Sequence, residues 1–433
     1  MMIHIPSMKE KTKGKKIGQL PDPSLFYMPL QEKFGSAPLP VVQVGEKVQR
    51  YQIIGRSEKG SPAIMHSPVS GVVKEISEYP QIDGSMSNTI VIENDFLNAE
   101  TREEAKDPAE YHTGELLDII RNAGIVGAGG AEFPTSVKFD LKGKIINTFI
   151  INGAECEPYM TADYAVMAQK TRELLDGILI VNRILQASRT VLAFESQNRE
   201  LKGIFEPFLQ QEKYRMIEIQ LLPDAYPQGG ELQLIKTVTG MEISKKILPA
   251  EAGVIVSNVG TVFAVYEAVF FRKPFVERVM TVTGEASGES GNYLIKIGTP
   301  LSHILQSTGM PPSGSLCIVG GPMMGKYAMS LSAPVTKGSG GILLLKPGNF
   351  RRLPCIWCGY CVDVCPMHLM PMKYEELFRK QRYKELPEFS LNDCIECGAC
   401  EYICPSKVPL VESIKKGKSK LKEIENANRE KTI

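Results

Sequence analysis

One cysteine motif, repeated near the C-terminus, constrains the fold and chemistry of this chain more than any other segment. Each copy reads C-x2-C-x2-C-x3-C-P, and the eight cysteines are Cys355, Cys358, Cys361, Cys365, Cys394, Cys397, Cys400 and Cys404. This spacing is typical of proteins that hold two [4Fe–4S] clusters, in which the fourth cysteine of each copy ligates the cluster of the other copy. The sequence therefore predicts one cluster on Cys355, Cys358, Cys361 and Cys404 and a second on Cys394, Cys397, Cys400 and Cys365.

Zinc sites and disulfides are the other common uses of closely spaced cysteines. A structural zinc site needs one or two C-x2-C pairs and often histidine, whereas the five histidines of this chain are scattered along the sequence. Matched metal spacing also indicates a reducing compartment, in which disulfides are rare. Iron–sulfur clusters are therefore favoured, and the remaining Cys156 and Cys317 are interpreted as ordinary buried thiols.

Length and composition bound the other possibilities. The chain has 433 residues, of which 43% are hydrophobic, enough for about three domains. Its net charge of +1 gives no global attraction to nucleic acid or to an anionic membrane. No apolar run approaches the ~18 residues of a membrane span, and the basic N-terminus precedes no apolar signal segment. We expect a cytoplasmic protein, soluble or peripherally bound to a membrane, with no nucleic-acid partner.

The N-terminal part of the chain reads as an arm followed by a small β domain. Residues 1–36 are polar and rich in proline and lysine, which indicates an arm. Residues 37–100 contain short β-branched runs separated by glycine, and their rhythm resembles the barrel-sandwich module of biotinyl and lipoyl carriers. Those carriers present a modifiable lysine at a hairpin tip, where residues 64–68 of this chain contain none. We therefore predict a structural role for this domain.

Residues 101–272 read as a Rossmann-like α/β domain that binds a ligand. A helix is predicted at 115–123, and the glycine-rich loop that follows contains Gly127, Gly129, Gly130, Phe133 and Lys138. Three glycines let backbone N–H groups converge on a phosphate, while Lys138 adds a charge and Phe133 offers its face to a flat ring. The loop lacks the G-x-x-x-x-G-K-[ST] order, which disfavours phosphoryl transfer.

Polar residues also follow three predicted strands of this domain. A buried parallel strand at 144–152 leads into Asn152, Glu155 and Glu157. After a helix at 166–186 and a strand at 190–194, strands at 218–222 and 253–256 precede two further loops, which contain Tyr226, Gly229, Gly230, Glu231, Asn258 and Thr261. Because open α/β sheets bind ligands at the carboxyl ends of their strands, we predict a ligand site among these loops.

Three segments complete the chain. Residues 273–347 show a strand–strand–helix–strand order that suggests a β-grasp module, and residues 348–412 form the helical ferredoxin-like domain with the two cluster motifs. Residues 413–433 carry seven Lys or Arg against three Glu, which indicates a basic, solvated tail. The expected fold class is therefore multidomain, α/β and α+β.

As a set, these motifs resemble the C subunit of the Rnf (or Rsx) electron-transport complex over about residues 30–412. The resemblance rests on the order of a barrel-sandwich module, G-x-G-G-A-x-F-P-T, N-G-A-E-C-E-P-Y, Y-P-Q-G-G-E, S-N-V-G-T, a β-grasp module and the paired cluster motifs. The α/β domain also resembles the FMN- and NADH-binding subunit of respiratory complex I. The resemblance implies noncovalent FMN, NAD(H) as substrate and two [4Fe–4S] clusters.

The resemblance also implies roles for individual residues. It places Gly127, Gly129, Gly130 and Lys138 at the FMN phosphate and ribityl chain. Asn152 and Glu155 match positions beside the isoalloxazine ring, and the other flavin loops are matched by Tyr226, Gly229, Gly230, Asn258 and Thr261. Positions that bind the nicotinamide dinucleotide, by adenine stacking or ribose hydrogen bonds, are matched by Phe133, Glu157 and Glu231. No residue is assigned to acid–base or nucleophilic catalysis.

Two positions depart from these families. The chain reads Met1-Met2-Ile3-His4-Ile5-Pro6 where the Rnf family usually has Gly-Gly-Ile-His-Pro-Pro, and Glu132 stands where the complex I relatives have glycine. A carboxylate at position 132 would crowd or repel a dinucleotide phosphate. These departures therefore bear on NAD binding more than on FMN binding.

The predicted function is that of a peripheral electron-transfer subunit, on the cytoplasmic side of the cell membrane, of an Rnf-type ferredoxin:NAD⁺ oxidoreductase. Its expected partners are integral membrane and iron–sulfur subunits, with ferredoxin reached indirectly. As an oxidoreductase acting on NADH, it would pass electrons between NAD(H), FMN and the clusters. Two alternatives stay open: a soluble NADH-dependent flavin and iron–sulfur reductase, similar to the cobalamin-reducing or proline-reductase-associated proteins, and a non-enzymatic iron–sulfur relay.

Overall fold

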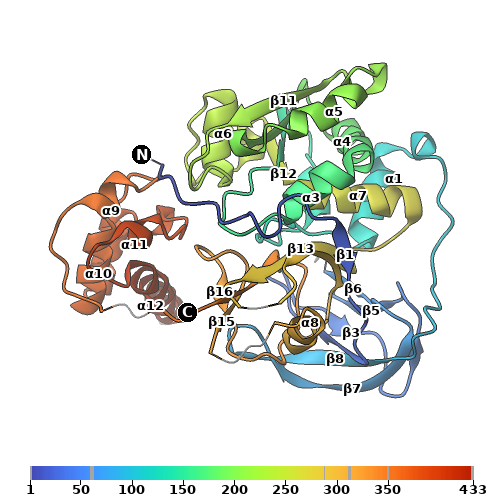
Figure 1. Ribbon diagram of the computed structural model, residues 1–433, viewed down its shortest axis with the longest axis horizontal. Helices are drawn as coiled ribbons and strands as arrows, with labels where there is room; N and C mark the ends of the chain where they lie inside the picture. Colours follow the sequence, from blue (N-terminus) through green and yellow to red (C-terminus); the bar gives the residue numbers. More distant parts are fainter. Residues whose placement is uncertain (1, 59–62, 287, 311–313, 349–350, 431–433) are drawn as a thin grey trace.

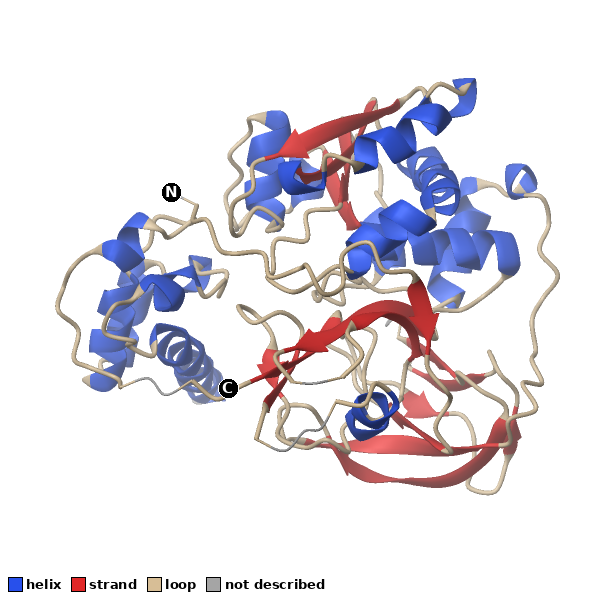
Figure 2. Ribbon diagram, in the orientation of Figure 1, coloured by secondary structure: helices blue, strands red, loops and turns tan. Residues whose placement is uncertain are grey.

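The computed structural model describes residues 2–58, 63–286, 288–310, 314–348 and 351–430, with the side chains of 428–430 left out. Residue 1 of the predicted arm and residues 431–433 of the predicted tail therefore lie outside the described residues. Figure 1 shows a helical domain, which contains the cluster motifs, standing to one side of three larger regions built around sheets. Figure 2 shows that helices dominate the upper of these regions and strands the lower ones.

The barrel-sandwich domain begins earlier than predicted. Its strands form two sheets, ordered β2-β8-β7-β4 and β3-β5-β6. Their bounds are β2 Leu25–Pro29, β3 Leu39–Pro40, β4 Lys47–Val48, β5 Ile53–Arg56, β6 Ile64–His66, β7 Gly71–Pro80 and β8 Met86–Asn94. Strand β2 lies in the predicted arm but pairs with β8, because Phe26 and Met28 on its inner face are buried in the core of this domain. The boundary predicted at residue 37 is thus too late.

The α/β domain is built on a wholly parallel sheet ordered β11-β10-β9-β12. The strands are β9 Thr148–Asn152, β10 Arg189–Glu195, β11 Ile217–Leu222 and β12 Val254–Asn258. The helices are α1 Thr113–Asn122, α2 Thr135–Phe139, α3 Ala162–Gln169, α4 Thr171–Leu185, α5 Leu201–Leu209, α6 Glu231–Thr239 and α7 Val259–Phe271. The single helix predicted at 166–186 is two helices, because Lys170 leaves the helical conformation between α3 and α4.

Both faces of this sheet are covered, which explains why its strands read as continuous apolar runs. Phe149 and Ile151 point into a core shared with α4 and α7, whereas Ile150 points into a second core with Leu234 and Ile235 of α6. The alternation follows from the two-residue period of a strand. At the carboxyl ends of β9 and β12, Asn152 and Asn258 lead into the loops predicted to bind a ligand.

The third region contains a six-stranded mixed sheet ordered β1-β14-β13-β17-β15-β16. Its elements are β1 Ile17–Gln19, β13 Glu277–Gly284, β14 Gly291–Lys296, α8 Leu301–Ser307, β15 Leu316–Val319, β16 Lys326–Tyr327 and β17 Gly341–Leu345. Strand β1 belongs to the predicted arm and pairs in parallel with β14. The arm is therefore a structural part of two sheets rather than a separate segment.

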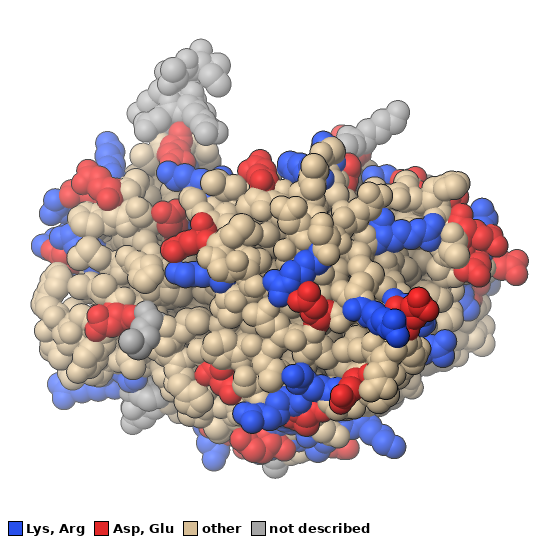
Figure 3. Space-filling model, turned by 90° about the horizontal axis from the view of Figure 1, so that it is seen from above, with Lys and Arg blue, Asp and Glu red and all other residues tan. Residues whose placement is uncertain are grey.

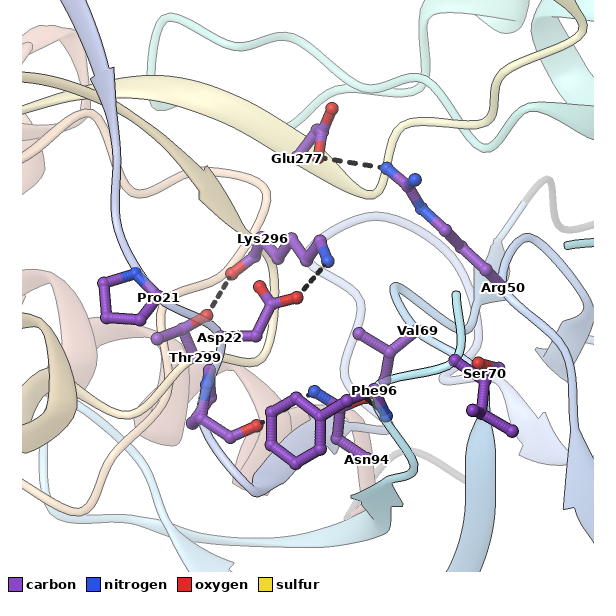
Figure 4. Close-up of polar contacts among 12 residues, drawn as sticks. Pro21, Asp22, Arg50, Val69, Ser70, Asn94, Phe96, Glu277, Lys296 and Thr299 are labelled. Carbon is purple, nitrogen blue, oxygen red and sulfur yellow. Dashed lines mark hydrogen bonds and ion pairs between the residues drawn. The ribbon is translucent and has the colours of Figure 1, made fainter. Parts of the chain in front are cut away.

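Ion pairs join this sheet to the barrel-sandwich domain. Lys296 of β14 contacts Asp22 at 2.5 Å, and Arg50 contacts Glu277 of β13 at 3.4 Å, as Figure 4 shows. Thr299 donates its hydroxyl to the Lys296 carbonyl at 2.8 Å, which holds the end of β14 beside Asp22. These partly buried pairs fix the two domains relative to each other.

The cluster domain contains α9 Tyr360–Asp363, α10 Pro371–Arg379, α11 Ala399–Ile403 and α12 Leu410–Glu430. Short 3₁₀ helices lie at Tyr383–Phe389 and Leu391–Asp393 here, and at Pro108–Glu110, Ser196–Asn198, Glu212–Tyr214 and Pro249–Ala252 elsewhere. The predicted basic tail is wrong, because α12 packs Ile414 and Leu421 into the core of this domain. Within the described ranges, no helix is long and apolar enough to cross a membrane.

Charged side chains of both signs are interspersed over the face shown in Figure 3. This distribution agrees with the net charge of +1. This face therefore presents no large field of one sign.

Candidate flavin and iron–sulfur sites

The eight motif cysteines line two separate cavities in the cluster domain. One cavity is lined by Cys355, Cys358, Cys361 and Cys404. The other is lined by Cys365, Cys394, Cys397 and Cys400. The structure thus groups the cysteines as the sequence predicts, with the fourth cysteine of each motif facing the cavity of the other. A set of four thiols around a cavity fits a [4Fe–4S] cluster.

Local backbone conformation places these cysteines around the cavities. Gly359 and Gly398 adopt positive φ angles of 84° and 79°, and each begins the short helix that carries the third cysteine of its motif. Among the described residues, no group of three or more His, Cys, Asp or Glu converges as it would on a single metal ion. The cysteines line the walls of the two cavities.

The two cavities differ in exposure. Cys358 is exposed, and its neighbours Ile356 and Trp357 are 65% and 59% exposed. Cys365, Cys397 and Cys400 of the other cavity are all buried. The Cys397 cavity also faces the α/β domain, because the Tyr226 hydroxyl donates to the Cys397 carbonyl at 2.6 Å. Lys245 supports the same contact by donating to the Cys394 carbonyl at 2.9 Å.

In the α/β domain, the strand ends bring two predicted residues together. Asn152 closes β9 and Asn258 closes β12, and the two residues are direct neighbours in the parallel register. The Asn258 side chain caps α7 by accepting from Gly260 N–H at 2.8 Å and donates to Asp163 at 2.7 Å. The Asn152 amide donates to the Gly229 carbonyl at 3.0 Å, which ties the first loop to the second.

The glycine-rich loop lies against the third strand-end loop. Ala128 N–H donates to the Thr261 hydroxyl at 2.8 Å, and Gly130 has a φ angle of 92° with open space where a Cβ would stand. In the part of the chain that the structure describes, the N–H groups of Gly129, Gly130 and Ala131 donate to no protein acceptor. Three consecutive available donors fit a phosphate group.

Lys138 and Glu231 contact each other at the mouth of these loops, with Nζ and Oε1 2.8 Å apart. The resemblance assigned Lys138 to the flavin phosphate and Glu231 to the dinucleotide. Both side chains are partly exposed, at 29% and 43%, so the pair is weak and open to exchange with a charged ligand. The structure therefore brings together two residues that the resemblance assigned to different ligands.

Glu155 lies beneath the loops rather than at their surface. Its carboxylate accepts from the N–H groups of Asp163 and Tyr164 at 3.1 and 3.2 Å, at the start of α3. Burial, and then the neighbouring Asp163 carboxylate, raises the pKa of Glu155 above its usual range. Its direct role here is to hold α3 against the strand ends.

Glu157 reaches the third region. Its two carboxylate oxygens accept from the N–H groups of Met323 and Met324 at 2.9 and 2.8 Å. Burial raises the pKa of Glu157 to about 7, although these two bonds oppose the shift. The residue therefore links the first strand-end loop to the Gly-Gly-Pro-Met-Met-Gly turn at 320–325.

Two residues of this site, Lys9 and Arg278, carry no signal in the sequence. Lys9 is 4% exposed and donates to the Glu155 carbonyl, although it lies in the polar arm. Arg278 of β13 is buried and donates to the Ala128 carbonyl at 2.8 Å. Cys156, interpreted as an ordinary thiol, accepts from Gly229 N–H at 3.4 Å, and burial raises its pKa to about 12. Only long-range folding brings Lys9 and Arg278 to the loops, so no local pattern could have identified them.

Three family models match successive parts of the chain. They are described as the RnfC barrel sandwich hybrid domain over residues 2–97, the Nuo51 FMN-binding domain over residues 120–267 and the 4Fe-4S dicluster domain over residues 354–408. The chain also shares its fold with a chain of an NAD⁺-reducing [NiFe]-hydrogenase in the H2-reduced state, at a TM-score of 0.52 and 19% identity, over 72% of this chain and 63% of that one. Together these features define a flavin- and iron–sulfur-containing electron-transfer protein.

Relatives that match most of this chain show which family it belongs to. The chain is 36% identical, over 89% of its length and 85% of the relative, to the C subunit of the proton-translocating ferredoxin:NAD(+) oxidoreductase complex of Clostridium ljungdahlii. It is 35% identical, over 98% of its length, to the C subunit of the ion-translocating oxidoreductase complex of Haemophilus influenzae, of which it spans 66%. The chain therefore belongs to the RnfC family, whose members are the C subunits of the ion-translocating oxidoreductase (Rnf) complexes.

Proposed function

We propose that this chain passes electrons between NAD(H), bound FMN and two [4Fe–4S] clusters, as a subunit of a membrane ferredoxin:NAD⁺ oxidoreductase. The cofactors follow from the FMN-binding and dicluster domains. NAD(H) is proposed as the substrate because the Clostridium relative belongs to a ferredoxin:NAD(+) oxidoreductase complex. The eight motif cysteines are the proposed cluster ligands, and the glycine-rich and strand-end loops are the proposed flavin site.

One observation carries this proposal: the second flavin loop contacts the ligand loop of one cluster. Tyr226 donates to the Cys397 carbonyl at 2.6 Å, while Gly229, three residues later, is bonded to both Cys156 and Asn152. A flavin at the strand ends and a cluster on Cys397 are therefore separated by a single loop. We infer that the Cys397 cluster exchanges electrons with the flavin and that the more exposed Cys358 cluster exchanges them with a partner.

When bound, FMN would supply both two-electron hydride chemistry and one-electron chemistry, which would join the nicotinamide to the one-electron clusters. The protein's own residues supply binding and orientation. Backbone N–H groups of the glycine-rich loop hold phosphate, Asn152 and Asn258 fix the loop ends, and the buried Cys397 cavity excludes water from the path. No side chain is required to act as an acid or base.

The finer architecture supports the same proposal. The parallel order β11-β10-β9-β12 supports a Rossmann-like domain, and the order β14-β13-β17-β15-β16, with β13 and β17 parallel, supports a β-grasp module. We propose that the protein binds peripherally on the cytoplasmic side of the membrane. Integral membrane subunits and an iron–sulfur subunit would be its partners, with ferredoxin reached through them.

Anaerobic purification, with quantitation of FMN and iron and an NADH titration, tests this function. About one FMN and eight irons per chain are expected, with NADH bleaching both flavin and cluster absorbance. Cys397→Ser should leave the flavin reducible by NADH but stop reduction of the remaining cluster. Cys355→Ser, the matched change in the outer motif, should leave the Cys397 cluster reducible.

Other outcomes would select other functions. Eight irons per chain without flavin would contradict NADH oxidation by this chain and would favour a non-enzymatic iron–sulfur relay. Flavin that NADH does not reduce would indicate another electron donor. A fully reducible protein that never co-purifies with membrane subunits would favour a soluble reductase.

A further inference from the structure

The glycine-rich loop is contacted from outside its own domain by Lys33. The Lys33 ammonium lies 2.6 Å from the Glu132 carboxylate and donates to the Gly130 carbonyl at 2.8 Å. Lys33 belongs to the connection between β2 and β3 of the barrel-sandwich domain, about 100 residues before the loop in sequence. Residue 33, which was predicted to lie in the arm, therefore brings the barrel-sandwich domain to the candidate ligand site.

Glu132 occupies a position that suits glycine. Its φ angle is 57°, in the left-handed region that side chains disfavour. A Cβ on Gly338 would collide with the Glu132 carboxylate, so this carboxylate packs directly against the third region. The Glu132 side chain is only 19% exposed, with Lys33 on one side. The carboxylate is thus held in a defined place beside a cation.

An aromatic pair lies next to this ion pair. The rings of Phe34 and Phe133 are edge to face, with their centroids 5.1 Å apart. Phe34 is 41% exposed, so part of its ring is open to contact with a ligand. Phe133 is the residue that the resemblance assigns to adenine stacking. A flat base placed against Phe133 would therefore meet Phe34 as well.

We propose that Lys33 and Phe34 complete the dinucleotide site, so that the barrel-sandwich domain takes part in substrate binding. Lys33 neutralises Glu132, which would otherwise repel the pyrophosphate of NAD(H) from the glycine-rich loop. Phe34 forms a second aromatic wall for the adenine. This inference rests on the proposed function and explains how a chain with glutamate at position 132 binds a dinucleotide.

The test uses ADP-ribose, which carries the adenine and pyrophosphate but cannot be reduced or oxidised. Its dissociation constant is measured by calorimetry on the full FMN-loaded chain, beside KM and kcat for NADH with ferricyanide as acceptor. Lys33→Met should weaken ADP-ribose binding about tenfold and raise KM similarly while kcat stays unchanged. Lys33→Arg should keep wild-type affinity. Phe34→Leu should weaken binding several-fold without changing the salt dependence.

The decisive comparison is between Lys33→Met and the double variant Lys33→Met/Glu132→Gly. Because the proposed role of Lys33 is to neutralise Glu132, removing both charges should restore the affinity that Lys33→Met alone loses. FMN content should equal wild type in every variant.

Three results would overturn the inference. Unchanged ADP-ribose affinity in Lys33→Met would exclude a role of Lys33 in binding while leaving the proposed function intact. A double variant as weak as Lys33→Met, or loss of FMN together with ADP-ribose, would indicate a merely structural contact. A wild-type chain that neither binds ADP-ribose nor is reduced by NADH would overturn both this inference and NAD as substrate.

Discussion

Glu155 and Glu157 lie two residues apart in one loop and contact different parts of the molecule. Glu155 supports the start of α3, whereas Glu157 accepts from the backbone of Met323 and Met324 in the third region. The sequence placed both at the ligand site, because strand ends are where ligands bind in α/β sheets. The sequence could not show that Glu157 would bond to the third region, since its partners there are more than 150 positions away.

Titration of Glu157 should make stability depend on pH. Burial raises its pKa from 4.5 to about 7, so the folded chain holds this proton where the unfolded chain has lost it. The contribution of this group to the free energy of unfolding is therefore fully present below pH 4.5. It declines as pH rises toward and past 7. Between about pH 5.5 and 8.5 the loss is about 2 kcal/mol. Urea denaturation of Glu157→Gln should show a flatter pH dependence by about that amount.

Glu218→Gln is the matched control, because Glu218 is 53% exposed and pairs with Arg189 at the surface. Its pH dependence should equal that of the wild-type chain. An equal slope in Glu157→Gln and wild type would show that Glu157 does not hold a proton in the folded state.

At the scale of elements, the strands of the α/β domain were predictable and the ends of the chain were not. Strand β9 reads as a buried parallel strand because both of its faces are covered, and the cysteine motifs specify their own local geometry. Strand β1 has three residues, too few for a periodic pattern, and pairs with β14. Helix α12 was not predicted, because its many Lys residues suggested a solvated tail. Its buried residues Leu410, Ile414 and Leu421 nevertheless recur at helical spacing.

Helix α12 should contribute to the stability of the cluster domain. Ile414 is 1% exposed, and Gly417 lets α12 approach Leu386 closely. Ile414→Ala should therefore destabilise this domain by about 2–5 kcal/mol, and Lys422→Ala on the exposed face should change stability by less than about 0.5 kcal/mol. Cluster absorbance followed during urea denaturation measures both. Equal midpoints for the two variants would mean that α12 is not packed in solution.

At the scale of the whole molecule, the N-terminal arm joins two domains, and a buried lysine anchors it to the α/β domain. The Lys9 ammonium donates to the Glu155 carbonyl and lies 4.0 Å from the Glu195 carboxylate, with both side chains almost fully buried. Further along the arm, the Asn292 amide donates to the Thr12 carbonyl at 3.3 Å, in the third region. The arm thus lies between the flavin loops and the six-stranded sheet.

Lys9→Met should destabilise the chain, because it leaves Glu195 buried without its cation. The expected cost is about 3 kcal/mol in the free energy of unfolding, and Lys9→Met/Glu195→Gln should recover most of it. Lys16→Met, at an exposed position of the same arm, is the control. A double variant as unstable as Lys9→Met would show that packing, rather than charge, is what Lys9 provides.

The pairing of the arm with the third region also sets an order of events during synthesis. Asp22 contacts Lys296, which follows it by 274 residues, and β1 pairs with β14. At ~5–20 residues per second, a ribosome adds those residues about 14–55 s after Asp22. Strand β1 therefore emerges first but finds its partner only after the α/β domain has been made. For that interval the nascent chain must keep a short unpaired strand free of other partners, and folding of the arm ends after folding of the domain that follows it.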